Sequence, residues 1–112
     1  MTSFWNGDGY GDNSCTGSGL CEKDLIPNEK GWYTYQGKLV VATATTYLQK
    51  SYGTIPGKRY FKYYDTFTIN INGVDYPAIV LDSCGAAMKS NIIDLYVTGP
   101  NSGVGKIKVS IH

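Results

Sequence analysis

Two aspartates, Asp82 and Asp94, mark the end of one apolar β-rich run and the start of the next, twelve positions apart. The residues between them include Gly85, Ala86 and Ala87, whose small side chains would leave room for a bulky chain such as a glycan. Two carboxylates in one groove push their pKa values apart, because like charges close together do not both ionise easily. One of them can then keep a proton at neutral pH and act as a general acid toward a glycosidic oxygen.

A structural role for the same residues is the alternative. An aspartate that follows a strand often accepts hydrogen bonds from backbone N–H groups just downstream, so Asp82 could simply cap the turn over 83–86. Lys89 is more often a solvated charge than a ligand at such a position. Tyr47 is one of many tyrosines that could stack on sugar rings, although tyrosine also decorates half-buried β surfaces.

The residue types and their spacing give little support for a metal site. The three cysteines show no CxxC spacing and the one histidine is His112, so no zinc site is expected. Asp8 and Asp12 lie in a Gly-rich run that lacks the closing glutamate of a calcium loop, which favours a turn-rich loop instead. We therefore expect neither a metal nor a cofactor.

The elements that must position the aspartates are short strands. Asn72-Gly73 between two alternating runs indicates a hairpin with a type I′ turn. The elements expected from Trp32 onward are a turn at 36–37, a strand over 39–47, a hairpin that turns at 72–73, a short turn or helix over 83–90, a strand over 92–97 and a closing strand over 104–112. No helical period extends far, so no helix longer than about two turns is expected. Five or six short strands predict a small closed barrel or sandwich, since closure removes exposed edges.

Length and composition set the remaining bounds. A chain of 112 residues makes one domain, with an irregular Gly-rich arm over 1–31 and a β-barrel over 32–112. The net charge of +1 favours neither nucleic acid nor an anionic membrane, although Lys58–Tyr64 interleaves basic and aromatic residues. No apolar run reaches the ~20 residues of a membrane helix. The first residues do not form a secretory signal, so export would use a signal outside this chain or another route.

An odd number of cysteines allows at most one internal disulfide. Cys15 and Cys21 flank a flexible spacer and could close a small loop. Either could instead reach Cys84, which would join the N-terminal arm to the loop after Asp82. We favour a sulfur of Cys15 or Cys21 lying near Cys84.

The chain resembles the double-psi β-barrels over residues 39–111, chiefly in the stretch 80–97. More narrowly, it is similar to the three-aspartate domain shared with membrane-bound lytic transglycosylase A and cell-wall resuscitation factors. The positions that match the strand, small turn and strand of that domain are Asp82, Gly85, Ala86, Lys89, Asp94, Leu95 and Tyr96. The aspartates are one residue further apart than in the pattern, Cys84-Gly85 replaces a double glycine, and no acidic residue follows Asp94 to serve as the third aspartate.

The resemblance implies a six-stranded double-psi β-barrel that cleaves peptidoglycan as a lytic transglycosylase does. Asp94 would be the catalytic acid/base and Asp82 its partner, with Lys89, Gly85, Tyr47 and Tyr96 binding substrate. Expansins and the rare lipoprotein A type share the barrel, so a wall-binding module that does not cut is an alternative. A structural barrel in a phage tail or a secreted wall-associated assembly is another. The expected location is extracellular, at the cell wall or in a virion, with a larger parent polypeptide or assembly as the possible partner.

Overall fold

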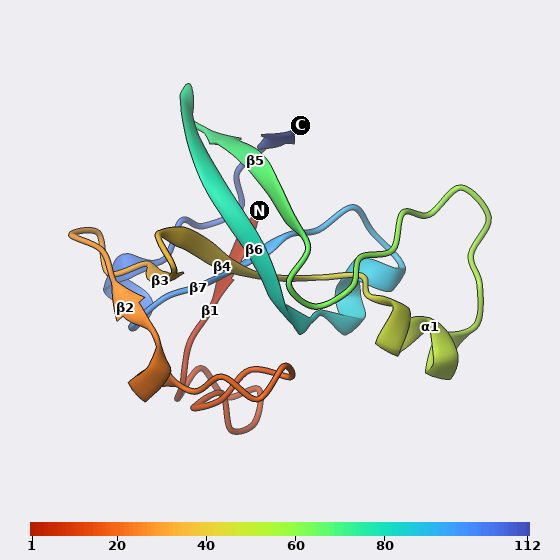
Figure 1. Ribbon diagram of the computed structural model, residues 1–112, viewed down its shortest axis with the longest axis horizontal. Coiled ribbons are helices and arrows are strands. Elements are labelled where there is room, and N and C mark those ends of the chain that lie inside the picture. Colours follow the sequence, from red (N-terminus) through yellow and green to blue (C-terminus); the bar gives the residue numbers. More distant parts are fainter.

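In the computed structural model, which describes residues 1–112, the chain folds into a curled mixed β-sheet with short helical turns at its margins (Figure 1). The elements in chain order are β1 (Thr2–Phe4), η1 (Glu22–Asp24), β2 (Ile26–Pro27), β3 (Tyr33–Tyr35), β4 (Lys38–Thr43), α1 (Thr46–Tyr52), β5 (Thr66–Ile71), β6 (Val74–Ser83), η2 (Gly85–Met88), β7 (Asp94–Tyr96), η3 (Pro100–Ser102) and β8 (Ser110–Ile111). The expectation of an all-β domain is confirmed.

The sheet is not the closed six-stranded barrel that the sequence suggested. It has eight strands, in the order β1-β7-β4-β6-β5-β8, with β3 paired to the start of β4 and β2 paired to β3. The pairs β1/β7 and β4/β6 are parallel and the other pairs are antiparallel. Two backbone hydrogen bonds between Met1 and Ile107 link the C-terminal segment to the β1 side of the sheet.

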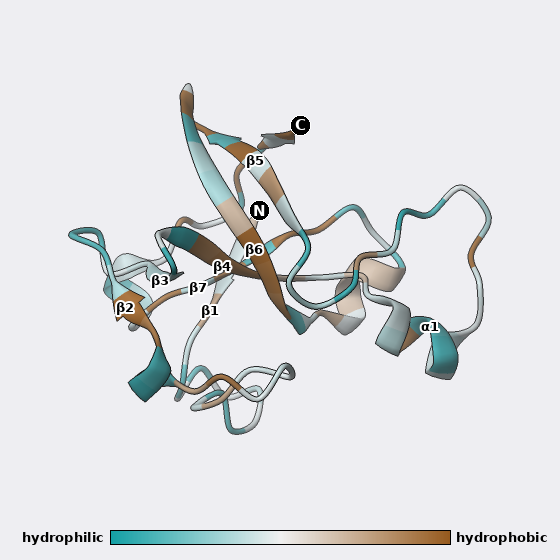
Figure 2. Ribbon diagram, in the orientation of Figure 1, coloured by the Kyte–Doolittle hydropathy of each residue, from teal (hydrophilic) through white to brown (hydrophobic).

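Two neighbouring strands, β4 and β6, form the centre of the molecule. Residues 39–42 of β4 and 78–81 of β6 form unbroken apolar runs, which is typical of parallel strands that are covered on each side (Figure 2). One face packs in a first core together with Trp32, Phe61 and Leu95. The other face packs in a second core together with Phe4, Tyr33 and Tyr96. The sheet therefore separates two cores that share these two strands.

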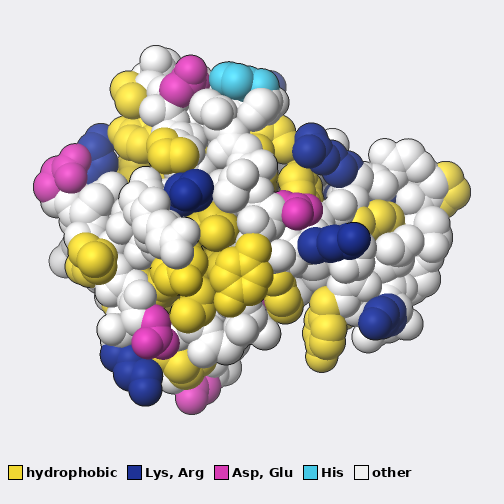
Figure 3. All heavy atoms as spheres, in the orientation of Figure 1, with side chains coloured by type: hydrophobic (Ala, Val, Ile, Leu, Met, Phe, Trp, Pro, Cys, Tyr) yellow, Lys and Arg dark blue, Asp and Glu magenta, His cyan; other side chains and the backbone are white.

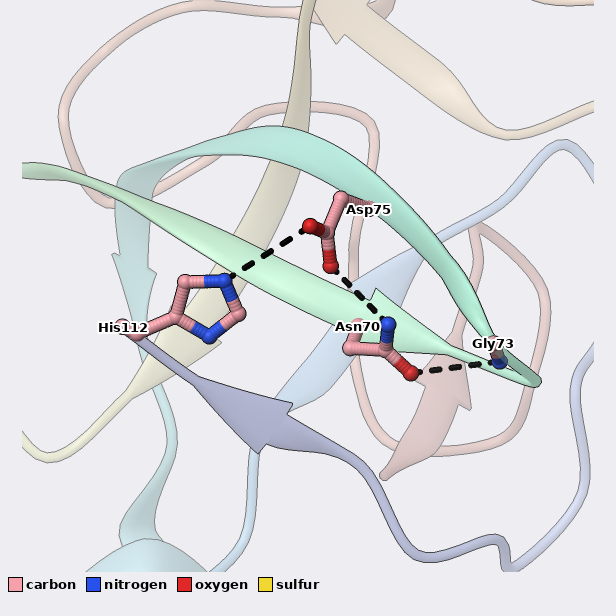
Figure 4. Close-up of polar contacts among 4 residues, drawn as sticks. All are labelled: Asn70, Gly73, Asp75 and His112. Carbon is pink, nitrogen blue, oxygen red and sulfur yellow. Dashed lines mark hydrogen bonds and ion pairs between the residues drawn. The ribbon is translucent and has the colours of Figure 1, made fainter.

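The β5–β6 hairpin is confirmed as the sequence predicts it. Asn72 and Gly73 have φ angles of 52° and 84°, as a type I′ turn requires at both central residues. Figure 4 shows how its polar side chains interlock: the Asn70 side-chain amide donates to Asp75, and the Gly73 N–H donates to the Asn70 side chain. His112 lies 3.7 Å from the Asp75 carboxylate, which brings the C-terminal end against the hairpin.

The strand expected over 39–47 ends early, because its last part begins a helix. Thr45 caps α1 by accepting a hydrogen bond from the Leu48 N–H, and Gly53, with φ at 82°, ends the helix. At seven residues α1 is about two turns long, within the limit expected. The β propensity of the Thr-rich run is overridden by this capping.

The closing strand expected over 104–112 is also shorter than predicted. Only Ser110–Ile111 pair with β5, and Gly105 has a positive φ of 67° that breaks the extended backbone. The apolar residues of this segment nevertheless pack on the first core; they are Val104, Ile107, Val109 and Ile111. Their spacing reflected burial rather than strand pairing.

The N-terminal arm is mostly irregular, but its first residues belong to the sheet. β1 pairs in parallel with β7, and the Phe4 ring stacks on Tyr96 with centroids 4.6 Å apart. The disulfide joins Cys15 to Cys21 and leaves Cys84 free, so the favoured pairing with Cys84 is wrong. The two cysteines lie opposite each other in a local antiparallel bridge, and that local turn brings them together. No helix is long and apolar enough to cross a membrane.

Candidate functional site

The central strand β4 places the two aspartates at one level of the sheet. Ala42 pairs with Asp82 of β6 on one side and with Asp94 of β7 on the other. Since neighbouring strands lie about 4.8 Å apart, the Cα atoms of the two aspartates are about 10 Å apart. On the far side of β7, Thr2 of β1 pairs with Asp94 and completes a row across four strands.

A β-bulge aims Asp82 into this row. The pairing of β4 with β6 shifts between Val41 and Ala42, so that Ala42 faces Asp82 where an unshifted register would place Leu81. Leu81 stays in the second core, and Asp82 lines an open groove of about 540 Å³ beside it. Bulges near functional sites often re-aim a side chain in this way.

The groove takes its walls from segments far apart in the sequence. Ala42 forms part of the floor, and the turn after β6 contributes Cys84, Gly85 and Ala86. The N-terminal segment supplies the opposite wall, with Asp8, Tyr10 and Asn13 from the Gly-rich loop. Both predicted carboxylates therefore face a single groove, as does the predicted residue Gly85.

The Asp94 carboxylate is half-buried and holds its proton more tightly than usual. Burial is the main cause that raises its pKa, and the charges of Asp8 and Asp82 raise it further. The Thr2 hydroxyl donates to Asp94 Oδ1 at 2.9 Å and opposes this rise, as does the amino group of Met1. A carboxyl group in such surroundings can serve as an acid.

Asp82 is held more firmly by the backbone. Its Oδ1 accepts hydrogen bonds of 2.9 Å from the N–H groups of Ser83 and Gly17. Burial raises the pKa of Asp82, and these two bonds oppose that rise. The capping interpretation is thus right for Ser83, but the second bond reaches a loop 65 positions away.

The pKa values of both carboxyl groups are raised, but the causes differ. The negative charge of Asp82 raises the pKa of Asp94, whereas burial and hydrogen bonds alone shift Asp82. Asp94 is therefore the carboxyl group whose pKa is raised both by burial and by neighbouring carboxylate charges.

A third carboxylate, Asp8, reaches the same groove and was missed as a site residue. Its oxygens accept from the backbone N–H groups of Trp5 and Tyr10 and from the Asn13 side chain. These bonds close the turn-rich loop that the sequence predicts. The parallel pairing of β1 with β7 carries this loop to Asp94, and no local sequence signal reveals such pairing.

Three of the predicted substrate-binding residues do not line the groove. Lys89 lies exposed beyond η2, beside a separate shallow depression, and Tyr47 is 65% exposed on α1. Tyr96 is fully buried between Phe4 and Tyr33, so it supports the second core and does not reach a substrate. Its phenol donates to the Asn13 carbonyl, and burial raises its pKa strongly.

Other aromatic side chains take the positions beside the groove. Tyr10 is 88% exposed and lines the wall formed by the Gly-rich loop. Tyr52, also exposed, has its hydroxyl 3.6 Å from the point where a Cβ on Gly85 would lie. The groove thus has one exposed ring on its wall and another next to the turn after β6.

The groove offers few groups suited to nucleophilic catalysis or to metal binding. Cys84 lines the groove, but burial and the two aspartate charges raise the pKa of its thiol, which disfavours the thiolate. No group of three or more His, Cys, Asp or Glu side chains is placed to hold a metal ion. Comparison with family models, curated proteins and solved structures finds no match for this chain.

Proposed function

We propose that the groove cleaves a cell-wall glycan strand in the manner of a lytic transglycosylase, with Asp94 as the acid/base. The observation that carries this proposal is the row Asp94–Ala42–Asp82, which puts two carboxylates of raised pKa in one open groove. Retaining and inverting glycosidases likewise use paired carboxyl groups that lie several ångströms apart.

The chemistry requires one proton donor. The Asp94 carboxylic acid protonates the glycosidic oxygen, and the bond from that oxygen to the anomeric carbon breaks. The 6-hydroxyl of the same sugar attacks the anomeric carbon and returns its proton to Asp94, which forms a 1,6-anhydro end and restores the acid. The Asp82 carboxylate stabilises the positive charge that develops on the sugar ring.

The proposal includes kinship with the double-psi barrels and their three-aspartate domain. The frame of strand, small-residue turn and strand from Asp82 to Asp94 supports it, as does the parallel pair β4/β6 at the centre. Asp8 stands in the groove as a third carboxylate, although it comes from the N-terminal arm. Peptidoglycan would be the substrate, and the protein would act outside the cell or within a wall-directed assembly.

A non-catalytic wall-binding module is the second candidate. The exposed rings of Tyr10 and Tyr52 beside the groove favour it, because flat rings stack on the apolar faces of sugars. The full occupation of Asp82 Oδ1 by two backbone N–H groups also suits a structural role for that residue. Such a module would bind the glycan and leave it intact.

The test is to incubate purified peptidoglycan with the protein and to look for 1,6-anhydro-muropeptides by mass spectrometry. Asp94→Asn should reduce product at least about 100-fold, since it removes the titrating proton and keeps the shape. Asp82→Asn should reduce it less. Asp75→Asn is the matched control, because Asp75 lies exposed on the same strand as Asp82 but far from the groove.

The outcomes separate the two candidates. Wild-type protein that sediments with peptidoglycan and releases no anhydro product supports the binding module and rejects the enzyme. Product that Asp94→Asn leaves unchanged rejects Asp94 as the acid/base. If the protein neither binds nor cleaves peptidoglycan, both candidates fail.

A further inference from the structure

A second concavity lies on the other side of the β4–β7 junction and is unrelated in character to the aspartate groove. It measures about 440 Å³, within the range of small-molecule sites. Ile92 contributes to both hollows, and Ala44 belongs to a small separate cluster with Ala87 and Met88. The other apolar residues of the second hollow belong to the first core or pack on it; they are Met1, Phe61, Ile93, Ile107, Val109 and Ile111. We call this hollow the C-terminal groove.

Three cationic side chains line this hollow, Lys58, Arg59 and Lys108, and no acidic side chain does. The amino group of Met1 also lies there and donates to the Ile107 carbonyl. Lys58 Nζ donates to the Ser90 carbonyl at 2.8 Å, and the Arg59 guanidinium lies 4.6 Å from the centre of the Phe61 ring. Lys108 is exposed. The protein's one ion pair, between Asp75 and His112, involves none of the three.

Such a combination selects for a particular ligand chemistry. Cations that have no acidic partner attract an anion, and burying a hydrocarbon chain against the apolar lining is favourable. A glycan would leave that lining uncovered. The lining is largely aliphatic, so it lacks the successive aromatic platforms on which single-stranded nucleic acids stack.

We propose that the C-terminal groove binds a small amphipathic carboxylate with a medium-length hydrocarbon chain. The carboxylate lies among Lys58, Arg59 and Lys108, and the chain covers Ile107 and Val109. This site does not depend on the function proposed for the aspartate groove, because the two hollows are lined by different polar residues.

The test is a titration of the protein with decanoate, below its micelle concentration, followed by two-dimensional NMR of the backbone amides. Decanol, with the same chain and no charge, and acetate, with the charge and no chain, are the matched ligands. We expect decanoate to shift amides of 43–44, 58–61, 91–93 and 107–111, decanol to bind several-fold more weakly, and acetate to give no saturable shift. Binding should weaken as salt concentration rises.

Variants locate the anion. Arg59→Gln and Lys108→Gln should each weaken decanoate binding roughly threefold, as expected for a partly exposed charge pair. Lys23→Gln, on η1, is the matched control and should leave the affinity unchanged. Unaltered melting temperatures will show that the variants are folded.

Three results would overturn the proposal. The first is equal affinity for decanol and decanoate, which would mean that the cations play no part. The second is a set of shifted amides that lies outside these four segments. The third is a loss of affinity in Lys23→Gln as large as in Arg59→Gln, which would reveal nonspecific charge attraction.

Discussion

At the residue scale, burial and nearby negative charge raise the pKa of the Asp94 carboxyl group. Its oxygen is bound by the Thr2 hydroxyl, and its surroundings include the carboxylates of Asp8 and Asp82. Burial outweighs the Thr2 bond, so the pKa of Asp94 is raised. A group of this kind stabilises the fold when protonated and destabilises it when ionised.

The stability of the protein should therefore fall as the pH rises through the raised pKa of Asp94. Because the folded protein binds this proton more tightly than the unfolded chain does, the contribution is complete below the unfolded pKa of about 4 and is lost above the folded one. Asp82 contributes with the same sign. In thermal melts from about pH 4 to pH 8, the melting temperature of Asp94→Asn should fall less than that of wild type. At neutral pH the variant should melt a few degrees above wild type.

The opposite result has a clear meaning. A lower melting temperature for Asp94→Asn at neutral pH would show that the ionised carboxylate, bound to Thr2, stabilises the fold. Activity offers a second measurement at the same position. Glycan cleavage should decline as the pH rises through the same pKa, since only the protonated form donates.

At the scale of elements, two hydrogen bonds join the disulfide loop over 15–21 to the end of β6, and one of them is from the Ser18 N–H to the Leu81 carbonyl. The Gly17 N–H donates to Asp82, and a Cβ on Gly17 would lie 2.4 Å from the Tyr63 hydroxyl and 2.9 Å from Asp82 Oδ1. The Tyr63 hydroxyl in turn bonds Ser83 Oγ. Glycine is thus required here for space.

Gly17→Ala should lower the free energy of unfolding by about 1–3 kcal/mol, because the added methyl forces the loop or Tyr63 away. Gly99→Ala is the matched control: its φ of 177° suits any residue, and nothing lies within 4 Å of the added Cβ. That control should change stability by less than about 0.5 kcal/mol. Urea denaturation measures both, and equal effects would show that the close approach does not matter.

At the scale of the whole molecule, two cores share the strands β4 and β6 and should unfold together. Leu81 is fully buried in the second core, whereas Trp32 is buried in the first and donates its indole N–H to the Ser102 carbonyl. A destabilising substitution in one core should therefore lower the unfolding midpoint measured by a probe in the other core.

Leu81→Ala should cost about 2–5 kcal/mol, the usual range when a buried leucine is truncated. The midpoint seen by tryptophan fluorescence should fall as much as the midpoint seen by far-ultraviolet circular dichroism. Trp5, which packs beside the first core, reports from the same side as Trp32. A fluorescence midpoint that stays at the wild-type value would show that the cores unfold independently.

Features that depend on a few neighbouring residues could be predicted from the amino-acid sequence. Asn72-Gly73 produces its hairpin because both residues adopt positive φ readily, and the small residues after Asp82 produce a short turn. The alternation of apolar residues located buried faces, even where residues 104–109 form no strand. These signals depend only on neighbouring residues, so they can be recognised without knowledge of the tertiary fold.

Which of these segments contact one another could be seen only in the folded protein. The parallel pairing of β1 with β7 brings Asp8 to the groove, the bulge in β6 aims Asp82, and the packing of the second core buries Tyr96. Each of these depends on contacts between residues far apart in the chain, whose energies come from burial and sheet pairing. Local patterns do not specify such partners, because the same apolar run can pair with any complementary strand.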